Sequence, residues 1–363
     1  MTTNSGFDKF FAQLKGRLEL ALDELVNLGA SMGMALPIVA REVLPRVQGK
    51  VLSAISILAS YHGGAQIVDK ELNDVQAAWP AKILGAPGFK PGRRAWGLAE
   101  MGWHRRLGTL FLERVIMDRA RILLLPRSAP ARKAFDRCAD RPGTWAGVAR
   151  NIVHNLDDGM GNRLAEITEV DWPCEASEVL EVAAARKKTA RHYRDKIMRP
   201  MINAYDAAWF ENHQGPRAID ETLPAWDYAA LQDDAQCPGE LLEGADLGPG
   251  DWVNYRLWAA VRSSQMHPHP VWGLGQGKAR VPECPLCGEK KVDVRHVVMA
   301  CDGTSEAWRK ATKGQGRPPR PWATNEEEIW ATLMELPETA DMLLERVRVV
   351  GECYRAFFHA SRQ

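Results

Sequence analysis

No stretch of this 363-residue sequence is apolar over the ~20 consecutive residues that a membrane-spanning helix requires. The segment Val51–Ser60 is apolar but too short for a span. The first residues lack the basic and apolar regions of a signal peptide, and internal repeats and low-complexity tracts are absent. We therefore expect a soluble intracellular protein, in the nucleus or the cytoplasm, without a membrane partner.

Net charge is almost absent as well, because 47 Lys and Arg face 46 Asp and Glu, a formal net charge of +1. The charges are nevertheless segregated along the chain. Residues 90–137 contain 12 basic and 4 acidic residues, and residues 256–320 contain 12 basic and 5 acidic ones. Residues 218–251 contain 9 acidic residues and no basic one. Two basic segments on either side of an acidic one indicate two modules and a connector.

Several catalytic motifs are missing from the sequence. It contains no G-x-S-x-G, no phosphate-binding glycine loop before a helix and no H-E-x-x-H, so the hydrolases and transferases that use these motifs find no support. Two Asp-Asp pairs occur, at 157–158 and at 233–234, but neither is flanked by alternating β-branched residues. Both pairs are typical of turns or loops, and we assign no catalytic residue.

Apolar residues recur at three- and four-residue spacing through most of the chain, a pattern typical of helices. The spacing predicts helices over residues 7–25, 36–61 (kinked near 45), 68–84, 93–125, 143–156, 176–213 and 252–266, and two short helices after residue 321. We expect a mainly α fold with three consecutive parts. These are a helical bundle in residues 1–126, a helical connector with an acidic linker in 127–251, and a small zinc module with C-terminal helices in 252–363.

The most specific pattern is Cys284-x2-Cys287-x8-His296-x4-Cys301. Two cysteines two residues apart on a tight turn can bind one ion together, and a following His and Cys can complete a tetrahedron. The soft thiolates favour Zn²⁺ over Mg²⁺ or Ca²⁺. The other four cysteines are isolated in the sequence: Cys138, Cys174, Cys237 and Cys353. We predict one zinc ion, and the odd number of cysteines indicates a reducing compartment.

The eight residues between Cys287 and His296 leave room for a turn and then a helix that starts at Asp293. Val294, Val297 and Val298 are expected to pack inward from that helix. His296 and Cys301 lie five residues apart and so not on one helical face, which predicts that the helix ends near residues 299–300 and that Cys301 turns back. Because all four ligands would come from the protein, no position remains for water, and the predicted site is structural.

Three stretches together resemble a known family. They are residues 71–115, preceded by the apolar segment 51–64, residues 191–209, and the run from NYRLWAAVR (254–262) through ECPLCGEKKVDVRHVVMAC (283–301). Their order is similar to that of the region downstream of the palm in non-LTR (LINE-like) retrotransposon reverse transcriptases. The resemblance implies a helical thumb, a helical connector and a CCHC zinc module that bind template RNA or target DNA. The palm with its catalytic carboxylates is missing, so a separate palm, or the rest of the element's protein, is an implied partner.

Basic residues supply the candidate nucleic-acid contacts, because phosphates bind lysine and arginine. In the first basic segment these are Lys90, Arg93, Arg94, Arg105, Arg106, Arg114, Arg119 and Arg121. Near the cysteines they are Lys278, Arg280, Lys290, Lys291, Arg295, Arg309 and Lys310. A further run of basic residues between 186 and 199 is typical of either a solvated helix face or a phosphate contact.

Two alternatives remain open. Trp96 and Trp103 interleave with the basic residues and could stack on bases, but their helical spacing favours a place in the core. The whole chain could also be a zinc-stabilised scaffold for proteins, without any nucleic-acid role. In that case the acidic segment 220–251 would bind a basic partner. A salt-dependent binding assay distinguishes the two functions.

Overall fold

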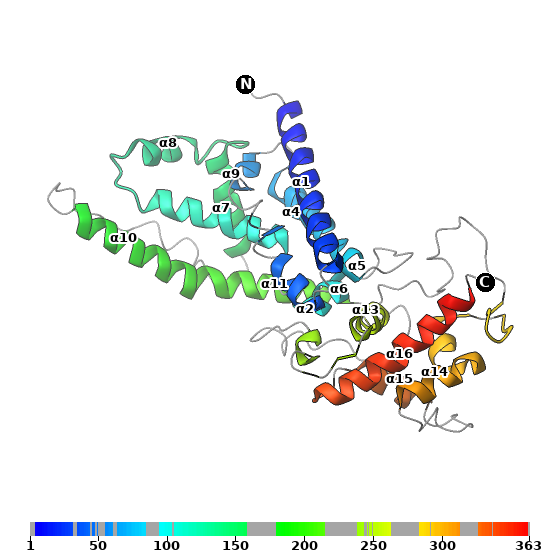
Figure 1. Ribbon diagram of the computed structural model, residues 1–363. Helices are drawn as coiled ribbons and strands as arrows, with labels where there is room; N and C mark the ends of the chain where they lie inside the picture. Colours follow the sequence, from blue (N-terminus) through cyan, green and yellow to red (C-terminus); the bar gives the residue numbers. More distant parts are fainter. Residues whose placement is uncertain are drawn as a thin grey trace. The chain divides into compact units, whose positions relative to one another are not determined.

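The computed structural model describes residues 4–31, 35–43, 46–47, 49, 55–60, 64–84, 94–103, 105–157, 179–214, 238–242, 245, 247–248, 250–262, 283–290, 292–312, 326–335 and 337–361. Within these ranges every regular element is a helix and none is a strand, which confirms the mainly α fold class (Figure 1). Apolar residues three and four positions apart, such as Leu14, Leu18 and Leu22, form helix faces that are buried.

The chain divides into two compact units. The first comprises Met1–Glu24, Val43–Gln76 and Arg105–Trp209, and the second comprises Leu25–Glu42, Ala77–His104 and Phe210–Gln363. Each unit therefore combines segments that are far apart in the sequence. The division into the three consecutive parts 1–126, 127–251 and 252–363 stays a prediction.

The first unit is built around α7. Helices with residues in this unit are α1 (Asn4–Ser31), η2 (Ile55–Ser60), α4 (Gly64–Ala77), α7 (Leu107–Leu123), α8 (Pro130–Cys138), α9 (Trp145–Asp157), α10 (Val179–Tyr193), the π-helical turn η5 (Arg194–Met198) and α11 (Arg199–Gln214). Phe111, Val115 and Ile116 of α7 are fully buried. α7 contacts η2, α8, α9 and α10, and α10 continues into η5 and α11 (Figure 1).

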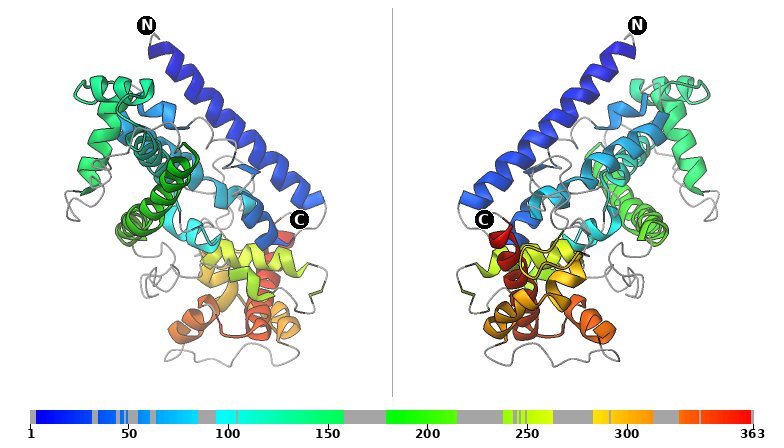
Figure 2. Two further views of the ribbon diagram at one scale, coloured as in Figure 1. Left: turned by 90° about the vertical axis from the view of Figure 1, so that its left-hand side faces the viewer. Right: turned by 90° about the vertical axis from the view of Figure 1, so that its right-hand side faces the viewer.

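The second unit is built around α16. Its elements are α2 (Leu36–Val43), α5 (Trp79–Leu84), α6 (Arg94–Glu100), η6 (Pro238–Leu242), α13 (Asp251–Arg262), η8 (His296–Ala300), η9 (Asp302–Thr304), α14 (Ser305–Ala311), α15 (Glu326–Met334) and α16 (Ala340–Ala360). Leu343, Val347, Val350, Tyr354 and Phe357 fall at helical spacing on α16 and are fully buried. That face packs against α13, α14 and η8 (Figure 2).

Buried polar groups of α13 fix its neighbours in the second unit. The indole Nε1 of Trp258 donates to the carbonyl of Leu333 over 2.8 Å, and Nε of Arg262 donates to the carbonyl of Met334 over 2.8 Å. The Arg262 guanidinium also forms a buried ion pair with Glu100. Since an unpaired buried charge is costly, these contacts define one position for α13.

The expected helices agree with most of these elements. The stripe in residues 7–25 lies in α1, the 68–84 stretch in α4 and α5, and the 252–266 stretch in α13, which ends at Arg262. The stretch 93–125 forms α6 and α7, and Trp103 between them is in the core as favoured, with its indole donating to the carbonyl of Ala40 over 3.1 Å. Two short C-terminal helices were expected. α15 has 9 residues, whereas α16 has 21 residues and is longer than expected.

Two further expectations concern places where the structure is only partly described. Asp157 is the last residue of the helix α9, and the other three acids of the two Asp-Asp pairs lie outside the described residues. Most of the acidic segment 218–251 lies outside them too. None of the helices in the described ranges carries an apolar stretch long enough to cross a bilayer.

Candidate metal centre

The first half of the site is a tight turn around Cys284 and Cys287. The amide of Cys284 donates to the carbonyl of Glu289 over 2.7 Å, and the amide of Gly288 donates to the carbonyl of Cys284 over 2.8 Å. Gly288 has a φ of 77°, a left-handed conformation that glycine adopts without a steric penalty. The turn thus brings the two cysteines to one side of a closed loop.

The second half is a short helix that begins where the sequence predicts. The Asp293 carboxylate accepts a hydrogen bond from the amide of His296 over 2.6 Å, as a helix N-cap does. Val294, Val297 and Val298 are fully buried, which confirms that they pack inward. The helix ends at residue 300, and Cys301 has an extended conformation, with φ −74° and ψ 116°.

A π-helical turn brings the last two ligands together. Five residues of an α-helix rotate by about 500°, which would leave the side chains of His296 and Cys301 about 140° apart. In η8 the amide of Cys301 instead donates to the carbonyl of His296 over 2.7 Å, an i→i+5 bond of a wider turn. The wider turn places both side chains toward the cysteine turn.

The four predicted ligands form one cluster. One donor atom from each of Cys284, Cys287, His296 and Cys301 lies within 4.8 Å of all the others. The sulfurs of Cys284 and Cys301 are 3.7 Å apart, and the sulfur of Cys287 is 3.4 Å from Nε2 of His296. A disulfide would bring sulfurs to about 2.05 Å, so Cys284 and Cys301 are not joined by one. The cluster could hold one metal ion.

Electrostatics of the cluster agree with a cationic occupant. Burial, together with the neighbouring Cys284, raises the pKa of the Cys301 thiol to about 12, and burial raises the pKa of Cys287 as well. Three thiolates side by side are therefore unfavourable without a positive charge between them. Metal ions bind thiolates and deprotonate coordinating thiols, so this set of donors fits a divalent ion.

The cluster joins the cysteine turn to the core of the second unit. Trp308 of α14 donates from Nε1 to the carbonyl of Val298 over 2.6 Å, and Thr304 donates from Oγ1 to the carbonyl of Val297 over 3.0 Å. A Cβ at Gly303 would lie 2.5 Å from Cβ of Leu286, so only glycine permits this approach of the turn. Helix η8 is thereby held against α14 and α16, and the cysteine turn approaches η9 at Gly303.

The predicted phosphate contacts have different environments. Lys290 is exposed, beside the exposed acids Glu283 and Glu289, and Arg295 is half-buried. Arg105 donates to Glu113 over 2.5 Å and to Asn203 over 3.1 Å. Arg114 lies 3.3 Å from Asp118. The following predicted contacts, or their side chains, lie outside the described residues: Lys90, Arg93, Arg94, Lys278, Arg280 and Lys291.

The prediction for Arg106 is corrected by the structure. Its side chain is 1% exposed, and its Nε lies 2.7 Å from Asp206. Charge and sequence position suggested a surface residue, but a carboxylate one hundred residues later neutralises the guanidinium inside the unit. Arg106 is therefore a core residue and offers no surface to a phosphate. Arg119, also among the candidates, is buried too.

The basic residues of α7 and those of α10, which are far apart in the sequence, lie close together in the first unit. Arg121 of α7 and the basic residues of α10 line one groove in the first unit. A partial signal was present in the sequence, because Met117 and Arg121 lie four residues apart and therefore on one face of α7.

Comparisons with protein-family models, with curated proteins and with solved structures find no match to this chain.

Proposed function

We propose that the Cys284, Cys287, His296 and Cys301 cluster holds one structural zinc ion. A tetrahedral zinc with Zn–S of about 2.3 Å and Zn–N of about 2.0–2.1 Å requires S···S of about 3.8 Å and S···N of about 3.6 Å. The corresponding separations here are 3.7 and 3.4 Å. Four protein donors close the tetrahedron, so the ion's role is to order the fold and not to activate water.

Metal analysis of the purified chain tests the zinc proposal. We expect one zinc per chain, and Cys284→Ser should lose it because a hydroxyl is a poor substitute for a thiolate at this ion. Cys138→Ser is the matched control, since Cys138 is a free, half-buried cysteine of the first unit. Metal-free chain with unchanged stability, or a Cys138 variant that loses zinc equally, contradicts the proposal.

We further propose that the chain binds nucleic acid, as the C-terminal piece of a protein similar to the non-LTR retrotransposon reverse transcriptases. The observation that carries this proposal is the metal centre, because its four ligands belong to the run with the most specific resemblance. Its partner would be template RNA or target DNA, and a separate polymerase palm or the rest of the element's protein would work beside it.

Partly exposed cations of the first unit support the proposal. Arg105 and Arg114 are 23% and 39% exposed, and each has a carboxylate partner, Glu113 and Asp118 respectively. Ion pairs at the surface contribute only about 0–1 kcal/mol, so a phosphate can replace the carboxylate at either guanidinium. Phosphate contacts of this kind position a nucleic acid without reading its sequence.

Salt dependence of binding tests this function. If about five phosphates are neutralised, log K should fall with log salt at a slope of about −4 on a duplex and less steeply on a single strand. The double variant Arg105→Glu, Arg114→Glu should weaken binding more than a control with two reversals on α1, at Lys9 and Arg17, which are both exposed. Absence of binding at low salt contradicts the proposal.

A second candidate is the zinc-stabilised scaffold for proteins. It is favoured by the mixed charge around the metal centre, where the acids Glu283, Glu289 and Asp293 are exposed beside Lys290. A surface that carries both acidic and basic side chains attracts a phosphate only weakly. Binding that is absent for nucleic acids but saturable for a protein would select this candidate.

A further inference from the structure

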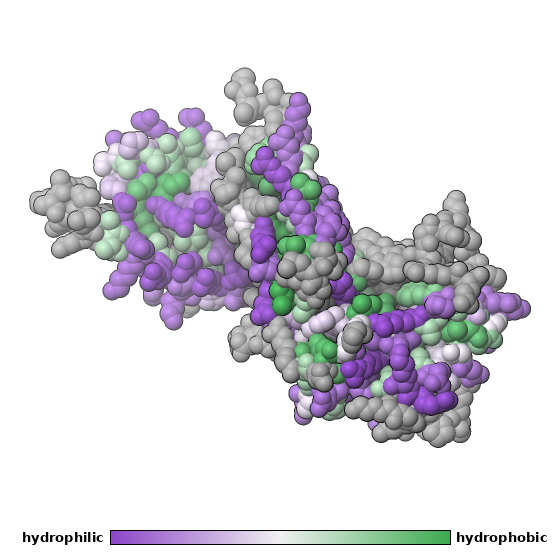
Figure 3. All heavy atoms as spheres, viewed as in Figure 1, coloured by the Kyte–Doolittle hydropathy of each residue, from purple (hydrophilic) through white to green (hydrophobic). Residues whose placement is uncertain are grey.

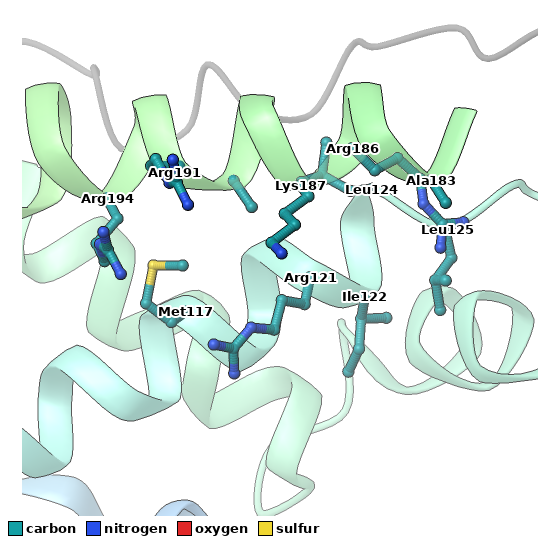
Figure 4. A pocket seen from close by; sticks show the side chains of 11 residues that line it. Met117, Arg121, Ile122, Leu124, Leu125, Ala183, Arg186, Lys187, Arg191 and Arg194 are labelled. Atoms are coloured by element: carbon teal, nitrogen blue, oxygen red, sulfur yellow. The ribbon is translucent and has the colours of Figure 1, made fainter. Parts of the chain in front are cut away.

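A groove of about 530 Å³ lies between α7 and α10 in the first unit. Its lining consists of Met117, Arg121, Ile122, Leu124 and Leu125 from α7 and the residues after it, and of Ala183, Arg186, Lys187, Ala190, Arg191 and Arg194 from α10 and η5. Figure 4 shows Lys187 and Arg191 extending from α10 toward α7, with Arg121 on the opposite helix. A band of hydrophilic residues follows α10 on the surface (Figure 3).

The groove is strongly basic. Five of its lining residues are cations and none is an acid. Two of them have carboxylates nearby, since Arg121 lies 2.9 Å from Asp118 and Arg194 lies 2.9 Å from Asp195. Arg186 and Lys187 make no ion pair with any residue in the described ranges. Five cations against two carboxylates leave an excess of positive charge that an anionic ligand can neutralise.

The floor of the groove is apolar. Met117 and Leu124 are buried, and Ile122 and Leu125 are half-exposed toward the groove, with the small residue Ala190 opposite. A ligand that fills the groove must therefore combine negative charges for the rim with apolar surface for the floor. Inorganic phosphate or a fully solvated polyanion has no apolar part and would leave the floor uncovered.

A single strand of nucleic acid has both parts. Its phosphates are anionic, and its unpaired bases expose flat faces that pack on apolar side chains and on guanidinium planes. Four of the five cations are arginines, which bind phosphate with two parallel hydrogen bonds and also stack on bases. A duplex keeps its base faces stacked inside, so only its phosphates could reach the groove.

The length of the groove sets the size of the ligand. From Arg186 to Arg194 the helix advances by about 12 Å, at about 1.5 Å per residue. At the ~3.4 Å rise of a stacked strand, this length corresponds to about three to four nucleotides. From the charge, the floor and the length together, we infer that the α7–α10 groove binds a single-stranded segment of RNA or DNA. This inference rests on the proposed nucleic-acid function and specifies the form of nucleic acid bound.

Neighbouring residues on α10 supply matched variants for the test. Lys187→Glu places a negative charge in the groove, and Lys188→Glu makes the same change one residue away, where the exposed side chain does not line the groove. Ala190→Glu adds bulk and charge at the groove, and Ala184→Glu does so on the exposed surface of the same helix. Within each pair the net charge of the chain is identical.

The full zinc-loaded chain is titrated with labelled oligothymidine and oligouridine of about ten nucleotides, and with a duplex of the same length, by fluorescence anisotropy at low salt. We expect the single strands to bind at least tenfold more tightly than the duplex. Lys187→Glu and Ala190→Glu should weaken that binding by about tenfold, and their controls by about twofold or less, because only the first two place a negative charge inside the groove.

Each other outcome overturns the inference in a recognisable way. If both variants of a pair lose the same affinity, or if the chain prefers the duplex, the groove is not the binding site for a single strand. The proposed nucleic-acid function then still stands. If no oligonucleotide binds, both the groove inference and the proposed nucleic-acid function are wrong. If an acidic amphipathic peptide binds instead, with the same sensitivity to Lys187→Glu, the groove belongs to a protein partner and the single-strand inference is wrong.

Discussion

Arg106 and Asp206, one hundred residues apart in the sequence, form a buried ion pair with 2.7 Å between Nε and Oδ1. Thr109 donates from Oγ1 to the same carboxylate oxygen over 2.5 Å. The guanidinium also lies 5.1 Å from the ring centre of Tyr205 and 4.6 Å from that of Trp209, distances typical of cation–π contacts. One arginine thus connects the start of α7 to α11.

Removing one partner of this pair should destabilise the first unit severely. Arg106→Met leaves the Asp206 carboxylate buried without its cation, and we expect the free energy of unfolding to fall by about 3–5 kcal/mol. The double variant Arg106→Met, Asp206→Leu should recover most of that loss, because an apolar pair needs no compensation. Denaturant unfolding of the unaltered chain, the single variant and the double variant measures both effects. A single variant with unchanged stability would show that the pair is dispensable.

Stability should depend on the titration of Asp206. Burial outweighs the attraction of Arg106 and raises the pKa of this carboxyl from 3.8 to about 6. The folded chain therefore binds more protons than the unfolded chain between about pH 4 and pH 6, and the free energy of unfolding falls as the pH rises through this window. A shift of about 2 units corresponds to about 3 kcal/mol as an upper figure.

The comparison that isolates this effect is between the chain and its Asp206→Asn variant. The advantage of the unaltered chain over the variant should be largest near pH 4 and should shrink up to pH 6, then stay constant. Urea unfolding at several pH values gives this difference directly, since other titrating groups, including the metal ligands, cancel. A difference that does not change between pH 4 and pH 6 contradicts the prediction.

Two glycines should respond oppositely to alanine. At Gly351 of α16 a Cβ would lie 2.4 Å from the side chain of the buried Asn254 of α13, so Gly351→Ala should push the two helices apart and cost about 1–3 kcal/mol. Gly16 in α1 has nothing within 4 Å of the added Cβ, so Gly16→Ala should stabilise by about 1 kcal/mol. Thermal unfolding of both variants measures the signs. Equal effects would mean that α13 and α16 pack less closely than described.

Chelation should loosen the metal centre before the rest of the chain. The cysteine turn 283–290 is held mainly by its ligands, and the free energy of metal binding is also free energy of folding. Hydrogen exchange after chelation should accelerate in 283–304 while α7 and α9 keep their protection. Readdition of zinc should restore the slow exchange. If both units lose protection together, the ion stabilises more than the second unit.

The chain alone should not extend a primer. Asp157 ends a helix and not a strand hairpin, and two metal ions for nucleotide transfer need paired carboxylates in a defined geometry. Primer extension on an RNA template with Mg²⁺ or Mn²⁺ should give background only, and Asp157→Ala should not change it. Extension that depends on Asp157 would overturn this interpretation.

The metal ligands could be predicted from the sequence because their signal is local. Cys284 and Cys287 share one turn, and the spacing to His296 and Cys301 already demanded a helix that begins at Asp293 and ends near residue 300. The inward valines were predictable for the same reason, since three- and four-residue spacing defines a helix face. Only the π-helical turn was not foreseen, because one i→i+5 hydrogen bond leaves no trace in composition or spacing.

Features that depend on distant partners could not be predicted. Arg106 has the same local context as its neighbour Arg105, yet Asp206 makes it a core residue. The α7–α10 groove likewise requires Arg121 and Lys187 to meet across more than sixty residues of sequence. Charge along a sequence shows which residues are basic, but packing decides which of them face solvent.

The i→i+5 bond between His296 and Cys301 makes the length of this segment more important than its composition. Substitutions among the residues between the two ligands leave the backbone turn intact as long as the buried valine positions stay apolar. Loss of a single residue would convert the π turn into an α turn and rotate the Cys301 thiol away from the other ligands. The segment between the two ligands should therefore tolerate drift in residue type over evolutionary time but not insertions or deletions.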